Sequence, residues 1–216
     1  MDTILSLQDV SKTYQSGTKR LTVLHNINFT VEAGSIVAIV GPSGSGKTTL
    51  LGLCAGLDRA STGTIELNKL RLDDKNEDER AFIRNRYIGF IFQNFQLMPT
   101  LTALENVMVP LELQGEKNIR SRSVTLLEKV GLSDRLHHYP AQLSGGEQQR
   151  VSIARAFSTN PKILFADEPT GNLDDETSGK IVPLLFALNR EAGTTLIIVT
   201  HNPELAESTQ RIIRLK

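Results

Sequence analysis

The sequence predicts an α/β fold that is built on a parallel sheet. Three short, uncharged apolar runs, at residues 35–40, 163–166 and 195–200, are typical of strands buried on both faces of a sheet. Segments with helical patterns lie between them, and a glycine-rich turn follows the first. Buried strands that alternate with helices indicate a parallel core sheet covered on both faces.

The other predicted strands are shorter or only half apolar. Residues 4–7 and 24–31 mix apolar and polar side chains, as half-buried antiparallel strands do, and residues 64–67 predict an edge strand. We assign these three to an N-terminal antiparallel β subdomain. Residues 87–92 are apolar again, and residues 211–215 predict a final short strand.

Five segments have a helical pattern. They span residues 47–57, 76–86, 102–130, 146–158 and 174–190. We expect the third to break near Pro110 and Gly115, and Pro183 to kink the last. Thr102 and Glu105 have the spacing of a capping box, which marks a helix start.

The stretch from about residue 94 to residue 142 is rich in helical pattern and contains no predicted strand. We interpret it as a helical subdomain inserted between core strands. A chain of 216 residues suits one large domain, or one domain with a small insertion. We therefore expect a single domain over residues 1–216, with the insertion at residues 94–142.

Composition excludes several functional classes. Lys and Arg total 24 and Asp and Glu total 24, which argues against a polybasic nucleic-acid-binding protein, although a local patch could exist within a neutral total. Cys54 is the only cysteine, so neither an internal disulfide nor a cysteine-based zinc site is supported. No apolar run approaches the roughly 18 residues that suggest a transmembrane helix, so any membrane role would go through a partner.

A phosphate-binding loop is predicted after the first buried strand. Residues 41–48 match G-x-x-x-x-G-K-[ST] at every fixed position, between a strand and a helix as the motif requires. Backbone amides and the helix N-terminus would surround a polyphosphate, Lys47 would reach the β- and γ-phosphates, and Thr48 would contact Mg²⁺. The expected ATP-binding residues here are Gly41, Pro42, Ser43, Gly44, Ser45, Gly46, Lys47, Thr48 and Thr49. The alternative is a glycine-rich turn with an exposed lysine.

Two acids follow the second buried strand. Asp167 and Glu168 come directly after residues 163–166, at the edge of the sheet where ligands bind in open α/β folds. This matches the Walker B pattern, in which Asp167 would hold Mg²⁺ through water. Glu168 would polarise the attacking water as a general base. The alternative is a pair of solvated acids that end a strand.

A second anion site is predicted at the start of another helix. Ser144 and Glu147 have capping-box spacing, and Gly145 and Gly146 would leave the helix N-terminus sterically bare. A bare N-terminus beside a serine hydroxyl can bind phosphate. An ordinary capping box would not explain the paired glycines.

The octet LSGGEQQR, at residues 143–150, resembles the signature motif of ATP-binding-cassette (ABC) ATPases, and the likeness covers essentially the whole chain. The resemblance implies the P-loop NTPase ABC ATPase fold. It also implies that Tyr14 stacks on adenine and that Gln93 contacts the metal and water. Asp174 would lie in the D-loop of the family, and His201 would contact the γ-phosphate.

Each of these four residues has a plainer alternative. Tyr14 could be an ordinary aromatic at a strand end, and Gln93 a solvated polar residue. His201 could belong to a turn capped by Asn202, and Asp174 could simply cap the next helix. Their order along a chain with a phosphate loop favours the functional interpretation.

Three further segments narrow the resemblance. Residues 92–107, 140–151 and 165–174 are similar to the lipoprotein-releasing and macrolide-export group, in which the ATPase is often a free subunit beside a permease. This implies an ATP- and Mg²⁺-dependent ATPase, a homodimer with ATP, and a position on the cytoplasmic face of the inner membrane. The substrate would be a lipoprotein or a lipophilic compound.

Two other functions stay open at this point. The ATPase could drive membrane signalling or a cell-division-type complex. It could also act on nucleic acid, but no coiled-coil insertion, zinc module or second cassette is visible, and we expect no nucleic-acid partner. One small departure from the family is Thr48–Thr49, where Ser-Thr is more usual; it keeps the hydroxyl.

Overall fold

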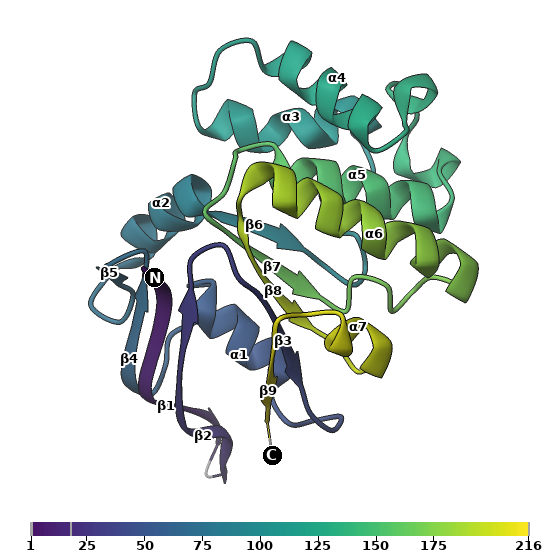
Figure 1. Ribbon diagram of the computed structural model, residues 1–216. Helices are drawn as coiled ribbons and strands as arrows, with labels where there is room; N and C mark the ends of the chain where they lie inside the picture. Colours follow the sequence, from purple (N-terminus) through teal and green to yellow (C-terminus); the bar gives the residue numbers. More distant parts are fainter. Residues whose placement is uncertain (1, 18, 216) are drawn as a thin grey trace. The chain divides into compact units, whose positions relative to one another are not determined.

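The computed structural model describes residues 2–17 and 19–215 of the chain, which forms two compact units (Figure 1). The first unit contains the chain up to Arg84 and again from Thr195 onward. The second unit is the segment Asn85–Thr194. Within the described residues, no helix is both long and apolar enough to span a membrane.

An antiparallel sheet occupies the N-terminal part of the first unit. Its strands are β1 (Thr3–Ser16), β2 (Lys19–Glu32), β4 (Thr62–Leu67) and β5 (Leu70–Arg71), in the order β2-β1-β4-β5. The strands predicted at residues 4–7 and 24–31 are confirmed, and both are longer than expected.

The prediction that residues 64–67 form an edge strand is wrong. β4 pairs with β1 on one side and with β5 on the other. The added strand depends on a tight turn in which Asn68 and Lys69 both have positive φ, 49° and 65°. That combination is typical of a type I′ hairpin turn. The turn lacks the usual glycine, so its sequence does not predict a hairpin.

Parallel strands form the rest of the first unit. β3 (Ile36–Val40) lies between β8 (Thr195–Val199) and β9 (Arg211–Arg214) and pairs in parallel with both. The helices here are α1 (Lys47–Cys54), most of α2 (Glu77–Tyr87) and α7 (Pro203–Glu207). α1 ends earlier than residue 57, because Gly56 adopts the left-handed conformation just beyond it (φ 65°).

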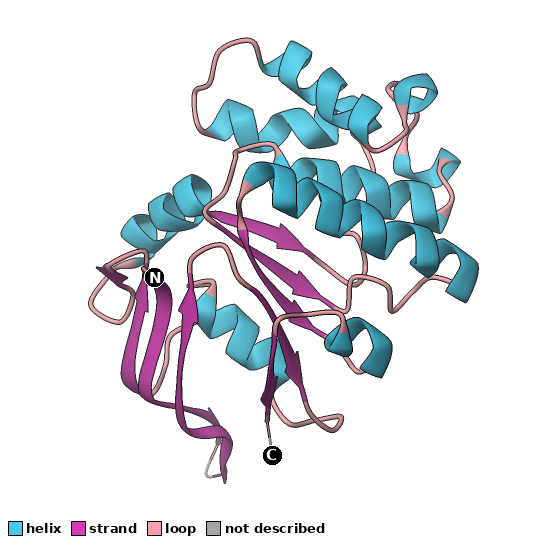
Figure 2. Ribbon diagram, in the orientation of Figure 1, coloured by secondary structure: helices cyan, strands magenta, loops and turns pink. Residues whose placement is uncertain are grey.

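The second unit combines two parallel strands with several helices (cyan in Figure 2). The strands are β6 (Ile88–Ile91) and β7 (Ile163–Asp167), and the α-helices are α3 (Ala103–Leu113), α4 (Ile119–Lys129), α5 (Gly145–Phe157) and α6 (Asp175–Ala192). Two short 3-10 helices follow α4, at Ser133–Arg135 and Pro140–Gln142. Residues 94–142 are all described and form helices, turns and loops. The single domain and its inserted subdomain stay predictions, since the helical stretch belongs to the same compact unit as β6 and β7.

The expected helix break near Pro110 is wrong, whereas the one near Gly115 is confirmed. α3 continues through Pro110 for a further turn. A proline inside a helix costs about 3 kcal/mol. Leu104, Val107 and Leu111 on the same helix are almost completely buried, and each such side chain contributes about 1.5–3 kcal/mol. Burial therefore outweighs the missing hydrogen bond. The capping box of Thr102 and Glu105 is present.

One glycine in the second unit gives a test of this packing. A Cβ on Gly89 in β6 would lie 2.4 Å from the carbonyl oxygen of Ala156 in α5, so Gly89→Ala should lower the free energy of unfolding by about 1–3 kcal/mol. Gly179 in α6 has nothing within 4 Å of such a Cβ, and Gly179→Ala should raise it by about 0.5–1 kcal/mol. Chemical denaturation of both variants checks this, and equal stabilities would contradict it.

Candidate functional site

The predicted site residues are divided between the two units. The first unit contains Tyr14, the loop of residues 41–49 and His201. The second contains Gln93, Ser144, Gly145, Gly146, Asp167, Glu168 and Asp174.

The loop from β3 to α1 depends on glycine. Gly44 and Gly46 have φ of 80° and 84°, which side chains with a Cβ rarely adopt. A Cβ on Gly46 would also lie 2.9 Å from side-chain atoms of Val23 and Leu24. Gly46 is the N-cap of α1 and provides no side-chain cap, so this helix starts without a side-chain acceptor for its first amides.

Two polar side chains lie inside this loop. The Lys47 amine donates hydrogen bonds to the carbonyl oxygens of Gly41 (3.0 Å) and Pro42 (2.8 Å), so it is folded back onto the loop. The Ser45 hydroxyl is buried and has no hydrogen-bond partner among the described residues. A cationic amine, an unpaired hydroxyl and an uncapped helix start fit a polyphosphate.

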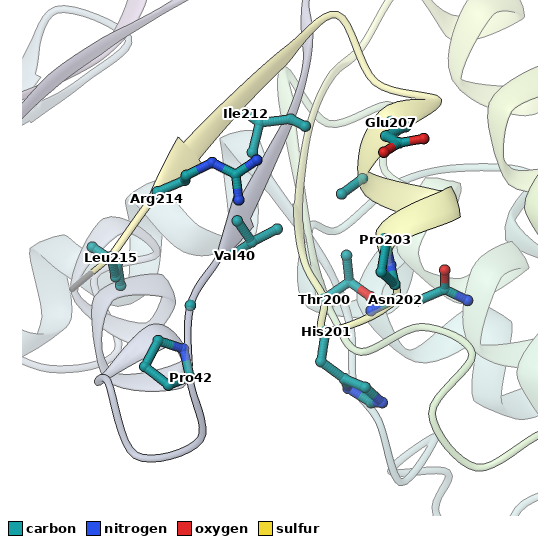
Figure 3. Close-up of a pocket in the computed structure, with 12 residues that line it drawn as sticks. Val40, Pro42, Thr200, His201, Asn202, Pro203, Glu207, Ile212, Arg214 and Leu215 are labelled. Atoms are coloured by element: carbon teal, nitrogen blue, oxygen red, sulfur yellow. Dashed lines mark hydrogen bonds between the residues drawn. The ribbon is translucent and has the colours of Figure 1, made fainter.

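His201 and the first two residues of the phosphate loop, Gly41 and Pro42, line one cavity of about 360 Å³ within the first unit. Figure 3 shows Pro42 and His201 on opposite sides of it. His201 is exposed and lies two residues beyond the end of β8. The Asn202 side chain accepts the Leu205 amide and caps α7, so the turn considered as an alternative is present as well. The structure thus brings His201 to the loop that would hold the phosphates.

Tyr14 lies on β1 with 43% of its surface exposed, which leaves room for a stacked ring. The Lys12 amine lies 4.8 Å from the ring centroid and 2.7 Å from Asp58, and the Tyr14 hydroxyl donates to the same carboxylate at 3.1 Å. Burial alone would raise the pKa of Asp58, but hydrogen bonds from Lys12, the Arg59 amide and Tyr14 bring it below its usual value. Sequence reasoning missed Lys12 and Asp58, because neither belongs to a motif.

Glu168 has a strained backbone at the end of β7. Its φ is 45°, and it precedes Pro169, a position that favours extended conformations. Such a conformation costs of order 1–3 kcal/mol and is typical of functional sites. The turn is closed by the Gly171 amide, which donates to the Glu168 carbonyl at 2.9 Å.

Gln93 and Glu168 converge at Gly171. A Cβ on Gly171 would lie 3.1 Å from the Gln93 side-chain nitrogen and 3.3 Å from the Glu168 Cβ. The Asn172 side chain donates to the Gln93 carbonyl (2.9 Å) and to the Asn94 side chain (2.8 Å). Asn172, which sequence reasoning did not single out as a site residue, thus joins the Gln93 loop to the turn after Glu168.

Asp174 is the N-cap of α6, as the plainer alternative suggested. Its carboxylate accepts the Thr177 amide at 2.8 Å and the Thr177 hydroxyl at 2.8 Å. The Thr177 amide is the main reason that the pKa of Asp174 lies below its usual value. This role does not depend on a nucleotide.

The start of α5 agrees only partly with the prediction. Ser144 caps the helix in a complete capping box with Glu147. Gly146, however, is buried, and a Cβ there would lie 2.6 Å from the Thr177 methyl group. This glycine allows α5 and α6 to approach closely and is not bare. Gly145 is the more open of the pair, since its Cβ would make only ordinary contacts, the nearest at 3.5 Å from Leu173.

The expected magnesium ligands are Thr48, Gln93 and Asp167. No cluster of three or more His, Cys, Asp or Glu side chains occurs among the described residues. Mg²⁺ in nucleotide sites commonly uses one or two carboxylates together with substrate phosphates and water. The expected ligands are a hydroxyl, an amide oxygen and a single carboxylate. These residue types suit Mg²⁺ better than they suit a cation that takes all its ligands from the protein.

Residues 24–171 match the ABC transporter family. The chain belongs to this family. It is an ATP-binding subunit of the ABC transporter type and an ATPase, and the resemblance of its motifs is confirmed.

Several known cassettes are similar over nearly the whole chain. Identity is 50% with the uncharacterized ABC transporter ATP-binding protein YbbA of Escherichia coli K12 and 47% with the lipoprotein-releasing system protein LolD of Legionella pneumophila strain Paris. Both alignments cover 99% of this chain and 95% of the relative. The macrolide export ATP-binding/permease protein MacB of Syntrophobacter fumaroxidans is 47% identical, but the chain spans only 30% of its length.

A solved structure has the same fold. The cassette MJ0796, in a dimeric post-hydrolysis state bound to ADP and Pi, superposes with a TM-score of 0.91 at 42% identity, covering 99% of this chain and 94% of that one. The predicted α/β ABC ATPase fold is thereby confirmed.

The signature helix of this cassette should show a defined pH dependence. The Ser144 amide and Arg135, which lies 3.0 Å away, hold the pKa of Glu147 below its usual value. A lowered pKa means that the stabilisation is complete above the unfolded value, near 4.3, and is lost as pH falls through the folded value. Glu147→Gln keeps an acceptor but cannot titrate. Its unfolding free energy should vary less with pH than the wild type does, by about 1 kcal/mol or less.

Denaturation measured between about pH 5 and pH 3, around the ordinary pKa of a glutamate, checks this. Asp134→Asn, which removes an exposed acid from the neighbouring 3-10 turn, is the matched control. Identical pH curves for the wild type and Glu147→Gln would contradict the assignment.

Proposed function

We propose that this cassette powers a separate integral-membrane permease that exports or extracts a lipoprotein or a lipophilic compound. The observation that supports ATP binding most directly is the loop after β3, with Lys47 folded onto it, an unpaired Ser45 hydroxyl and an uncapped α1. The support for the transport role is the likeness to relatives named for lipoprotein release and macrolide export.

The residues of the two units have complementary roles in this proposal. The amides of residues 41–49 and Lys47 bind the phosphates, and the exposed ring of Tyr14 stacks on adenine. Thr48, Gln93 and Asp167 hold Mg²⁺, which neutralises phosphate charge when bound. Glu168 polarises the attacking water.

His201 and Gln93 complete the catalytic set. His201 contacts the terminal phosphate from the cavity that it shares with the loop. Gln93 lies beside Glu168 at Gly171, where it can orient the same water and respond to the permease. The strained φ of Glu168 supports a functional reason for its position.

Two copies of the chain would form the complete sites. α1 offers an uncapped start to a nucleotide, and the Ser144–Gly146 start of α5 is a second anion site in the other unit. In a head-to-tail pair, each α5 start would contact the nucleotide held by the partner copy, with twofold symmetry. Asp174 would lie near the seam. The dimeric cassettes among the structural neighbours support this arrangement.

The permease would dock on the loop after Gln93, with the cassette peripheral on the cytoplasmic face of the membrane. The apolar residues in this loop and the following helix are Phe95, Leu97, Met98, Leu101, Leu104, Val107, Met108 and Val109. Leu104 and Val107 are buried in α3, and Met98 is the most accessible of the set, at 38%.

One buried side chain holds the loop that carries Met98. The buried Asn106 side chain accepts the Met98 amide and donates to the carbonyls of Met98, Leu101 and Thr102. A single side chain in α3 thus fixes the backbone of residues 98–102. Met98 is thereby held at the surface in a defined position.

ATP-dependent dimerisation tests the composite sites. Glu168→Gln keeps the shape but removes the base, so it should bind Mg·ATP, hydrolyse it at least about 100-fold more slowly and accumulate as a dimer in size-exclusion chromatography. Adding Ser144→Arg should block the dimer, because it removes the cap and adds bulk. Adding Lys47→Ala should block it by abolishing nucleotide binding. A Glu168→Gln protein that stays monomeric at saturating ATP, with wild-type hydrolysis independent of protein concentration, would contradict the composite site.

Permease docking is tested at Met98. Met98→Asp should prevent co-purification with the integral-membrane subunit and abolish stimulation of ATP hydrolysis by it, while basal hydrolysis stays within about twofold, because an acidic side chain cannot be buried against an apolar surface. Leu21→Asp, at an apolar residue 66% exposed on β2, is the control and should keep both properties. Full stimulation of the Met98→Asp protein would refute this docking site.

A further inference from the structure

A buried amide connects the signature helix to the catalytic turn. Gln149 lies on α5 and is completely buried. Its side-chain nitrogen donates a 2.6 Å hydrogen bond to the carbonyl oxygen of Pro169, the residue after Glu168. A carbonyl can only accept, so the orientation of this amide is fixed by its partner.

The other end of the same amide is unsatisfied. The Gln149 side-chain oxygen is buried without a hydrogen-bond partner in the described part of the chain. A buried unpaired acceptor is costly, and an apolar side chain of similar length would avoid that cost. The hydrogen bond from the side-chain nitrogen to Pro169 therefore explains why an amide, and not an apolar side chain, occupies this position.

The turn that Gln149 contacts is short and strained. It begins at Glu168, with φ of 45°, and is closed by the Gly171 amide on the Glu168 carbonyl. Asn172 and Asp174 hold its far end. Gln149 supplies the side-chain contact at Pro169, next to Glu168, and it comes from a different element.

The N-terminus of the helix that carries Gln149 is the proposed second anion site. Ser144 caps α5, and Gln149 is five residues further along, about 7.5 Å at 1.5 Å per residue. One and a half turns of a helix transmit a displacement of the N-terminus as a rigid piece. A shift of the Ser144 end would therefore move the donor that holds Pro169.

We propose that Gln149 is a positioning residue, which sets the backbone of Glu168 according to the placement of the signature helix. This rests on the proposed role of Glu168 as the general base. In a closed dimer, the α5 start is held by the nucleotide of the partner copy, and Gln149 fixes Pro169 so that the Glu168 carboxylate faces the water. With the α5 start free, the turn is less constrained and hydrolysis is slow.

The test separates turnover from nucleotide binding in the full chain. Gln149→Met retains the length of the side chain but has no donor for Pro169. Its kcat for ATP should fall at least about tenfold, while ATP affinity in calorimetry stays within about twofold, because the binding loop lies in the other unit. In the Glu168→Gln background, Gln149→Met should still form the ATP-dependent dimer, since Ser144–Gly146 are intact.

Ser152→Ala is the matched control. Ser152 lies one turn further along α5, is equally buried, and also carries an unpaired polar atom, but its hydroxyl makes no hydrogen bond to the catalytic turn in the described part of the chain. Its kcat should stay within about twofold of wild type. A role of Gln149 in packing alone would affect the two variants alike and would leave turnover of the folded protein unchanged.

A second variant covers the case in which Gln149→Met does not fold. In Gln149→Glu, the ionised carboxylate cannot donate to Pro169, whereas the protonated acid has the shape of the amide and can. Its kcat relative to wild type should therefore recover as pH is lowered from 8 to 6, a window taken as roughly that of a buried glutamate.

The outcomes are distinguishable from those of the earlier proposal. Two results would overturn the positioning role, provided that the Glu168→Gln protein is inactive. One is a wild-type kcat in Gln149→Met. The other is a kcat of Gln149→Glu that does not recover at lower pH. Loss of the dimer in the double variant would also overturn it, because Gln149 would then act on the signature helix itself. A fully active Glu168→Gln protein would instead refute the assignment of the base.

Discussion

The first turn of α1 is the feature on which the nucleotide site depends. Gly46 stands at its N-cap, in a left-handed conformation that brings it against Val23 and Leu24, and it offers no side-chain acceptor to the amides that follow. A helix start without a side-chain cap favours an anion, and the aligned peptide dipoles add to that preference. Lys47 and Ser45 lie inside the same loop and would complete the proposed phosphate site.

The start of α5, unlike that of α1, is capped by side chains. Ser144 and Glu147 satisfy each other's backbone amides in a capping box, so this helix start is already stable without a ligand. A phosphate there would compete with an existing arrangement. The contrast suits the proposed dimer, in which the nucleotide must remain on its own α1 while contact with the α5 of the other copy is made and lost in each cycle.

The sequence predicted most of the elements, because buried runs, glycines and caps are local signals. It failed where a distant contact decides the outcome. β5 depends on pairing with β4 across an Asn-Lys turn, and Pro110 stays helical because its neighbours on α3 are buried. The phosphate loop and the acid pair after β7 are likewise predicted from spacing, whereas Tyr14, Gln93, Asp174 and His201 are predicted from the family resemblance. Sequence reasoning did not identify Lys12, Asp58, Asn172 and Gln149 as site residues. Each acts through a partner that is distant in the sequence and is brought near only by folding.

Asn106 has a consequence for the energetics of partner recognition. By fixing the backbone around Met98, this one side chain orders the loop when the subunit folds and not when a partner arrives. Ordering a flexible surface on association costs about 0.5–1.5 kcal/mol for each side chain that is immobilised. A partner that meets an already ordered loop avoids part of this entropy loss, so a small contact area would suffice for a specific complex that still separates readily.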